Sequence, residues 1–174
     1  MRRVGLANTF LISDTHFCHA NILTFRNKLG GFLREFESIQ EHDEFLIDAW
    51  NSVVGVNDKV YHLGDIGFFN ASKMKEIFSR LKGTKVLIKG NHDILKLSAY
   101  AEVFKDVRAT HTLDRFILSH VPIHPKSLER WRGNIHGHLH DGSLDGNYEC
   151  VSVEHLKDYK PIPFEDIRKK YREN

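Results

Sequence analysis

The sequence Thr84-Lys85-Val86-Leu87-Ile88-Lys89-Gly90-Asn91-His92-Asp93 decides the fold that we expect for this chain. Its first part is β-branched and apolar, which predicts a buried strand, and Gly90 allows a sharp turn where that strand ends. An amide oxygen, an imidazole and a carboxylate follow directly. Because ligands bind at the carboxyl ends of the strands in open α/β sheets, these three side chains are predicted to lie at a functional site.

Four other segments place metal-binding residue types after a hydrophobic run or a glycine turn. They are Asp14-Thr15-His16 after residues 9–13, Gly64-Asp65 after residues 60–63, Ser119-His120 after residues 116–118, and Gly137-His138-Leu139-His140. A single Asp-x-His or His-x-His pair occurs often by chance. All five segments together are not easily explained by chance, and they predict one shared site.

The composition is that of an ordinary globular protein. The 174 residues fit one domain, residues 1–174, with 41% hydrophobic and 28% charged residues. No apolar run has the length of a membrane helix, and the basic N-terminus lacks a signal-like apolar stretch. Cys18 and Cys150 are too few for a disulfide framework, which favours a reduced, cytoplasmic location. A net charge of +2 is too small to imply a nucleic-acid partner by itself.

Capping residues and helical periodicity predict a parallel first half. Ser38-Ile39-Gln40-Glu41 is typical of a capping box, and the helix that it starts is expected to end near Gly55. Asn70 is a suitable cap for a second helix that Gly83 closes. The apolar face of the first helix consists of Ile39, Leu46, Ala49, Trp50 and Val53. Strands between these helices give βαβ units.

The second half has a different pattern. Short strands are predicted over residues 103–108, 113–119 and 149–153, with a turn between the first two. Short helices are predicted over residues 94–101 and from about residue 164 to 171. The chain is therefore expected to form one α/β domain with a partly antiparallel second half.

Seven residues are candidate metal ligands: Asp14, His16, Asp65, Asn91, His120, His138 and His140. A zinc ion with an open position takes three protein ligands, so seven ligands suit two ions that share a carboxylate. Imidazole, carboxylate and amide donors suit manganese, iron, cobalt, nickel or zinc. In the Asp-x-His and His-x-His pairs, positions i and i+2 of an extended segment point the same way, so each pair can converge.

The remaining histidines and Cys18 have simpler explanations. His62 is expected to pack or hydrogen-bond within its strand, and His136 is either an outer group behind the ligands or an ordinary strand residue. Surface or turn positions are expected for His42, His111 and His155. Cys18 is interpreted as a small buried residue.

In this order, the five segments resemble the calcineurin-like metallophosphoesterase family over residues 9 to about 153. Ser13-Asp14-Thr15-His16-Phe17 and Asn134-Ile135-His136-Gly137-His138-Leu139-His140 are most similar to its small, uncapped bacterial and phage members. The resemblance implies a four-layer α/β/β/α sandwich of two mixed β-sheets flanked by helices. It also implies two divalent ions, with manganese the first expectation and iron, nickel, cobalt or zinc as alternatives.

The same resemblance assigns roles to the site residues. Asp14, His16 and His140 would hold the first metal ion, Asp65 would bridge both ions, and Asn91, His120 and His138 would hold the second. His92 would be a non-ligand histidine that protonates the leaving oxygen or steadies the phosphoryl group. The sequence Gly64-Asp65-Ile66-Gly67-Phe68-Phe69 lacks the aspartate and arginine of the protein-phosphatase members, which argues against that activity. Cys18 stands where small members often have glycine and could narrow the approach to the first metal.

The expected function is hydrolysis of phosphate esters, in particular nucleotide-type phosphodiesters, by a hydroxide that bridges two metal ions. A phosphomonoesterase with the same site is the alternative within the enzyme class. A non-catalytic interaction module of this fold, or a nucleic-acid binder that uses basic loops, are the rivals outside it. The expected partner is a small phosphoester or nucleotide; a membrane is not expected, and nucleic acid is expected only as a substrate.

Two segments are candidates for binding the substrate. His19 lies in a long loop that is predicted near the site. The stretch from residue 124 to 133 lies between the fourth and fifth motifs, so we expect it to stay near the metal ions. Its candidate contacts are His124, Lys126, Arg130, Trp131 and Arg132. The cations could contact phosphate oxygens and the tryptophan could stack on a base, or the segment could be a solvated loop with Trp131 in the core.

Overall fold

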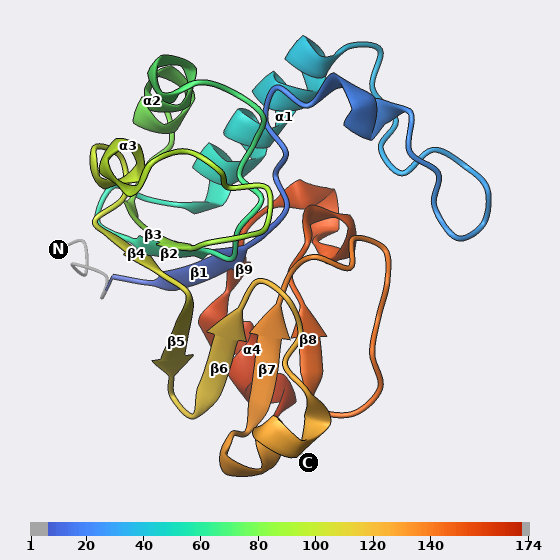
Figure 1. The fold of residues 1–174 in the computed structure, drawn as a ribbon, viewed down its shortest axis with the longest axis vertical. Helices are drawn as coiled ribbons and strands as arrows, with labels where there is room; N and C mark the ends of the chain where they lie inside the picture. Colours follow the sequence, from blue (N-terminus) through green and yellow to red (C-terminus); the bar gives the residue numbers. More distant parts are fainter. Residues whose placement is uncertain (1–6, 172–174) are drawn as a thin grey trace, which may run out of the picture.

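The computed structural model describes residues 7–171 and contains two mixed β-sheets (Figure 1). The strand order of the first sheet is β4-β3-β2-β1-β9. The bounds of its strands are β1 (Thr9–Ile12), β2 (Lys59–His62), β3 (Thr84–Ile88), β4 (Asp106–Arg108) and β9 (Ile162–Pro163). β1 to β4 run parallel, as the βαβ pattern predicts, and β9 pairs antiparallel with β1.

The second sheet follows from the second half of the chain. Its strands, in the order β5-β6-β7-β8, are β5 (Thr110–Leu113), β6 (Phe116–Ser119), β7 (Gly133–His136) and β8 (Tyr148–Cys150). β5 is antiparallel to β6, whereas β6, β7 and β8 are parallel. In Figure 1 the arrowheads of β6, β7 and β8 point toward the first sheet. The predicted fold class, an α/β sandwich of two mixed sheets with flanking helices, is confirmed.

The helices lie beside these sheets. The α-helices are α1 (Ile39–Val53), α2 (Ala71–Ser79), α3 (Leu97–Ala101) and α4 (Phe164–Lys170). Short 3₁₀ helices are η1 (Ala20–Leu23), η2 (Pro125–Arg130), η3 (Val153–His155) and η4 (Lys157–Tyr159). In Figure 1, α1, α2 and α3 gather beside the first sheet, and α4 lies behind the second. Phe164 of α4 meets Phe116 of β6 edge-on, with ring centroids 5.8 Å apart.

The predicted helix starts are confirmed with one change. Ser38 Oγ accepts a hydrogen bond from the backbone N–H of Glu41 at 3.1 Å, and Asn70 Oδ1 accepts one from Lys73 at 2.9 Å. The Glu41 carboxylate, however, accepts from the N–H of Glu37 instead of returning to Ser38. Each cap satisfies amides that the first turn of a helix leaves free.

Several predicted details are wrong. Val53 is 38% exposed, whereas His42, expected on the surface, is fully buried on α1. The expected turn between residues 108 and 113 is the strand β5, and β9 was not predicted. Strands of two to four residues are too short for alternating hydrophobicity in the sequence to reveal them.

One hydrophobic core spans both sheets, with Leu11, Val60 and Leu87 from the first and Phe116 and Ile135 from the second. Among residues 7–171, no helix has the length and apolar character that crossing a membrane requires. The basic residues of the N-terminus, Arg2 and Arg3, lie outside the described residues.

Candidate metal centre

The first candidate group consists of Asp14, His16 and His140, whose ligand atoms lie within 4.8 Å of one another. Asp14 Oδ2 accepts hydrogen bonds from Ser152 Oγ at 2.7 Å and from the backbone N–H of His138 at 2.9 Å. Asp14 Oδ1 and His16 Nε2, in contrast, are buried and have no hydrogen-bond partner. They lie 3.9 Å apart. Buried polar atoms are almost always satisfied, so this pair marks a place for a cation.

The second candidate group consists of Asp65, His120 and His138. His120 Nδ1 lies 2.7 Å from the carbonyl oxygen of Leu63, which can only accept, so Nδ1 carries the proton. Nε2 of the same ring then faces Asp65 Oδ2 at 3.3 Å and Asn91 Oδ1 at 2.8 Å. Asn91 Oδ1 also lies 3.0 Å from Nδ1 of His138. The Asn91 amide oxygen thus lies within hydrogen-bond distance of both imidazoles of the second group.

Asp65 connects the two groups. Its Oδ2 lies 3.3 Å from His120 Nε2 in the second group and 3.9 Å from His16 Nε2 in the first. Its Oδ1 accepts a hydrogen bond from the backbone N–H of His92 at 2.9 Å. Burial alone raises the pKa of Asp65, but the hydrogen bond with His120, its charge and the His92 N–H outweigh burial and lower the pKa to about 2. Asp65 is therefore an ionised carboxylate that lies between the two candidate groups.

The donor set fits metal ions of the expected kind. The two groups offer imidazole nitrogens and carboxylate oxygens, with the Asn91 amide beside them, and no thiolate. Burial, followed by the charge of Arg34, lowers the pKa of His16 to about 2, so its imidazole is neutral and able to bind a metal. Two potential metal sites are therefore present, and all seven sequence-predicted ligands lie in or beside them.

The ligands lie on sharply turned backbone, which differs from the extended segments predicted for the Asp-x-His and His-x-His pairs. Asp14, His16, Asp65, His138 and His140 have positive φ values of 57°, 50°, 54°, 70° and 50°. They lie in turns after the strands, not in extended segments. Left-handed conformations are strained for residues with a side chain and concentrate at functional sites. The i and i+2 ligands thus converge because alternate residues turn sharply.

Asp93 holds two of these turns together. Its Oδ2 accepts from the N–H groups of Gly90 at 2.7 Å and Asp65 at 3.0 Å, and its Oδ1 accepts from Ile66 at 3.0 Å. The sequence left open whether Asp93 orients His92 or caps a helix. The structure shows neither role: the carboxylate joins the turn after β3 to the turn after β2, which fixes Asn91 relative to Asp65.

Gly137 allows a close approach between the fifth motif and the first. A Cβ atom at this position would overlap Ser13 Oγ and Asp14 Oδ2 and would lie 2.7 Å from Ser13 Cβ. We expect Gly137→Ala to displace Asp14 and to weaken metal binding by at least about 10-fold, the lower range for loss of a supporting contact. Titration calorimetry with Mn²⁺ checks this. Gly31→Ala is the control, because its Cβ would meet only the side chain of Asn27; equal affinities of both variants would contradict the expectation.

Arg34 and Glu154 support the first group, and the sequence analysis missed both. Glu154 Oε1 accepts from His140 Nδ1 at 3.1 Å and from Arg34 Nη2 at 2.8 Å. Arg34 also donates to the carbonyl oxygens of Asp14 and Thr15. Burial alone raises the pKa of Glu154, but Arg34 and His140 outweigh it and lower the pKa to about 2. Only the placement of a lone acid between apolar Val153 and Leu156 signals Glu154 in the sequence.

The Glu154 carboxylate holds the His140 ring so that Nδ1–H donates to Glu154. The other ring nitrogen, Nε2, is then free to bind a metal ion. Such carboxylate–histidine pairs orient a ligand and raise its basicity. We expect Glu154→Gln to lower Mn²⁺ affinity about 10- to 100-fold, because the carboxamide keeps the shape and removes the charge. Calorimetry measures this, with Glu44→Gln, in an exposed ion pair with Arg80, as the control. Unchanged affinity in Glu154→Gln would show that His140 needs no such support.

Of the predicted substrate contacts, only His19 lies beside the metal groups. His19 Nδ1 is 3.1 Å from His16 Nδ1, and the His19 ring stacks on Phe68 with centroids 3.9 Å apart. The segment with His124, Lys126, Arg130, Trp131 and Arg132 runs instead to the start of β7. Gly133 pairs with Phe116 at the first residues of two parallel strands, and the Arg132 guanidinium lies 5.9 Å from the Phe116 ring. The structure does not bring Trp131 and Arg132 to the metal groups, because β6 and β7 are parallel and the connection must return to the opposite end of the sheet.

The other singled-out residues have structural contacts. His62 is buried and packed as predicted: its Nδ1 accepts from the backbone N–H of Gly64, just after its own strand, at 3.2 Å, and its Nε2 lies 2.9 Å from Thr15 Oγ1. The fully buried His42 contacts the Arg34 guanidinium at 2.9 Å. The backbone N–H of Cys18 donates to the Asp43 carboxylate, and burial, followed by the Asp43 charge, raises the pKa of the Cys18 thiol to about 11. Cys18 is therefore a thiol and not a metal-binding thiolate.

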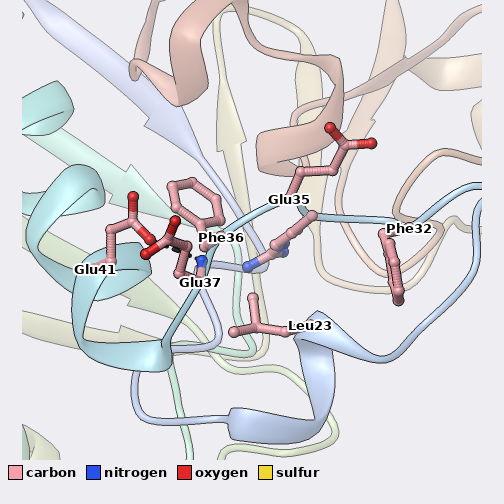
Figure 2. A pocket seen from close by; sticks show the side chains of 7 residues that line it. Leu23, Phe32, Glu35, Phe36, Glu37 and Glu41 are labelled. Atoms are coloured by element: carbon pink, nitrogen blue, oxygen red, sulfur yellow. Dashed lines mark hydrogen bonds between the residues drawn. The ribbon is translucent and has the colours of Figure 1, made fainter.

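A cavity of about 410 Å³ lies next to Arg34 (Figure 2). It is lined by Leu23, Phe32, Arg34, Glu35, Phe36, Glu37 and Glu41. None of the candidate ligands lines it. Three glutamates would repel a phosphate anion, so this cavity does not suit the phosphate of an ester.

Comparison with known proteins identifies relatives without a stated function. No family model matches the chain. A solved structure, the protein of unknown function AQ665 from Aquifex aeolicus, is similar with a TM-score of 0.73 and 28% identity over 95% of this chain and 100% of that chain. A protein from Streptococcus pneumoniae TIGR4, described as a conserved uncharacterized protein and predicted phosphoesterase, aligns at 16% identity over 84% of this chain and 71% of its own, with a TM-score of 0.35. That score is too low to bear on function.

The uncharacterized protein MJ1445 of Methanocaldococcus jannaschii is 35% identical over 177 residues, which cover 95% of this chain and 92% of MJ1445. Such identity over nearly the full length of both proteins establishes common descent. The chain therefore belongs to the protein family of MJ1445.

Proposed function

We propose that this protein is a two-metal phosphoesterase of the calcineurin-like type, which hydrolyses nucleotide-type phosphodiesters. The observation that carries the proposal is the convergence of seven ligand side chains at the carboxyl ends of five strands, with Asp14 Oδ1 and His16 Nε2 buried and without a hydrogen-bond partner. Asp65, with its Oδ2 atom 3.3 Å from His120 and 3.9 Å from His16, lies between the two groups. Paired metal sites bridged by a carboxylate are typical of enzymes that displace an oxygen at phosphorus.

In this proposal each group of side chains holds one cation. Asp14, His16, His140 and Asp65 would hold the first ion, and Asp65, Asn91, His120 and His138 the second. When bound, the two ions would lower the pKa of water to near neutral and neutralise charge on the phosphoryl oxygens. Manganese is our first expectation, with iron, cobalt, nickel or zinc as alternatives, because the donors are imidazole, carboxylate and amide.

His92 is positioned to serve as the proton donor. Its backbone N–H is bonded to Asp65 Oδ1 at 2.9 Å, and its ring centroid lies 6.0 Å from that of His16. The imidazole therefore stands beside the cation groups without belonging to either of them. A protonated His92 ring would donate to the departing alkoxide oxygen, a contribution of about 10²- to 10⁴-fold.

The open surroundings of the site favour a diester. Phe68, which contacts the His16 and His92 rings, is 41% exposed, and Val121, next to His120, is 49% exposed. A phosphate with an organic group on each side needs space at both ends. A monoester needs only one such space, so the exposure of both flanks supports the diesterase assignment.

The test compares phosphate-ester hydrolysis by the protein after metal removal with EDTA and after metal is added back. We expect EDTA to abolish cleavage of bis(4-nitrophenyl) phosphate and Mn²⁺ to restore it, with slower cleavage of 4-nitrophenyl phosphate. Faster cleavage of the monoester would make the protein a phosphomonoesterase with the same site. No cleavage with any of the five metals would overturn the proposal in favour of a non-catalytic module.

A further inference from the structure

Three rings extend from the metal groups across the surface, the half-buried His19 and the exposed Phe25 and Phe68, and we call them the aromatic rim. Phe68 lies with its ring centroid 5.2 Å from that of His92 and 3.9 Å from that of His19. Phe25 meets His19 edge-on at 5.7 Å. Phe25 and Phe68 are 43% and 41% exposed. Large rings exposed side by side, next to a candidate catalytic histidine, form a surface on which planar groups can stack.

The rim continues into a hairpin, residues 25–33, which we call the arm. The backbones of Arg26 and Phe32 form an isolated antiparallel β-bridge across the hairpin. The N–H of Leu33 donates to the carbonyl oxygen of Phe25 at 2.8 Å. In Figure 1 this light-blue loop projects away from both sheets. The backbone N–H of Lys28 donates to Asp141 Oδ2 at 2.8 Å. Because Asp141 follows His140 directly, this bond ties the arm to the loop that carries a candidate metal ligand.

The arm carries two cationic side chains, Arg26 and Lys28, and within the described residues the Asp141 carboxylate meets only the backbone N–H of Lys28. Among residues 7–171, neither Arg26 nor Lys28 forms an ion pair, and the Arg26 guanidinium lies over the Phe32 ring at 3.8 Å. The acidic residues Glu35 and Glu37 line the cavity of Figure 2, and Phe32 of the arm lines it too. A polyanion that leaves the metal groups is therefore attracted along residues 25–28 and repelled from the cavity.

From these observations we propose that the aromatic rim and the arm bind a single-stranded oligonucleotide, with one base on Phe68 and the adjoining phosphates near Arg26 and Lys28. Proteins bind single-stranded nucleic acids through aromatic rings, on which bases stack, and through neighbouring cations, which contact the phosphates. This inference rests on the proposed function and narrows its substrate to a strand several nucleotides long. It replaces Trp131, which lies at the far end of β7, with Phe68 as the residue that stacks on a base.

The experiment measures binding by the full chain in EDTA, where metal-dependent cleavage cannot occur. Fluorescein-labelled (dT)₁₂ and (rU)₁₂ are titrated and followed by anisotropy at several salt concentrations. We expect Phe68→Ala to weaken binding about 5- to 150-fold, which corresponds to the loss of one stacked base, and Phe68→Trp to keep it. Phe25→Ala should also weaken binding. Within the described residues this change removes one ring contact, that of Phe25 with His19. The two probes show whether DNA, RNA or both are bound.

Charge is tested separately from stacking. Replacing Arg26 and Lys28 by alanine should reduce the slope of log K against log salt by about 1.4, because two single-strand phosphate contacts are lost. The matched controls are Phe45→Ala, a 42% exposed phenylalanine on α1, and Lys105→Ala, an exposed lysine before the amino end of β4. If neither probe binds to the wild type, or if the rim variants bind as Phe45→Ala does, the inference is overturned.

Hydrolysis of bis(4-nitrophenyl) phosphate by the same preparations with Mn²⁺ separates the two proposals. Metal-dependent hydrolysis without oligonucleotide binding would reject the rim and leave the phosphoesterase assignment intact. Oligonucleotide binding that depends on Phe68, without hydrolysis, would reject the phosphoesterase assignment and leave the rim as a binding surface.

Discussion

Asp65→Asn is expected to remove metal from both sites and to lower phosphodiester hydrolysis by at least about 10³-fold. Asp65 Oδ2 faces His120 Nε2 at 3.3 Å and His16 Nε2 at 3.9 Å, so one substitution removes negative charge from both cation positions. A metal ion stabilises transition-state charge by several kcal/mol, and each 1.36 kcal/mol corresponds to a tenfold rate. Elemental analysis and kcat/KM for bis(4-nitrophenyl) phosphate are the measurements.

The control for this variant lies at the other end of the same strand. Asp58 precedes β2, as Asp65 follows it, and accepts hydrogen bonds from the backbone of Asn8 and Gly55. Asp58→Asn should keep both metal ions and the full rate. Two ions and a near wild-type rate in Asp65→Asn would rule out a shared ligand.

His92→Ala is expected to keep both metal ions and to slow the cleavage of esters with basic leaving groups by about 10²- to 10⁴-fold. The ring is not part of either ligand group, although the His92 backbone is bonded to Asp65. A good leaving group such as nitrophenolate departs with little protonation, so its ester should lose much less. Rates across a series of esters with alcohols of rising pKa, together with metal content, test this.

His111→Ala is the matched histidine control, because His111 contacts Tyr61 Oη at 3.1 Å between the two sheets and lies outside both metal groups. It should leave the dependence on the leaving group unchanged. Equal losses on activated and unactivated esters in His92→Ala would eliminate proton donation. A role for His92 in steadying the phosphoryl group would then account for the loss.

Much of the site could be predicted because its residues follow strands. Buried apolar runs locate β1, β2, β3 and β6, and the chemistry of the residues just after them is visible in the sequence. The parallel strands of the first sheet bring three of these positions to one edge, and β6 of the second sheet ends toward the first sheet (Figure 1). Their exact approach could not be predicted, because it depends on positive φ values at Asp14, His16 and His138 and on three N–H groups gathered by Asp93.

Contacts between residues far apart in the chain could not be predicted from the sequence, for a different reason. Arg34 and Glu154 are 120 positions apart, and neither sits in a motif or a periodic face. Only the folded chain shows that they meet behind His140. The apolar neighbours of Glu154 in the sequence hint at its burial, but nothing in them indicates that Arg34 is its partner.

The placement of residues 124–133 follows from the topology of the second sheet. Nearness in sequence to His120 and His138 suggested nearness in space, but a connection between parallel strands must cross from one end of the sheet to the other. Phe68 lies three residues after Asp65, and nothing in the sequence Gly64–Phe69 distinguishes it from a buried phenylalanine. Its exposed ring beside His92 became evident only in the structure.

The central claim is that the two residue groups each hold a metal ion. The most direct test is elemental analysis of the wild-type protein after chelation, reconstitution with excess Mn²⁺ and removal of free metal. The account predicts two ions per chain, with phosphodiesterase activity that appears and disappears with them. At most one ion per chain, with activity unaffected by chelation, would contradict it.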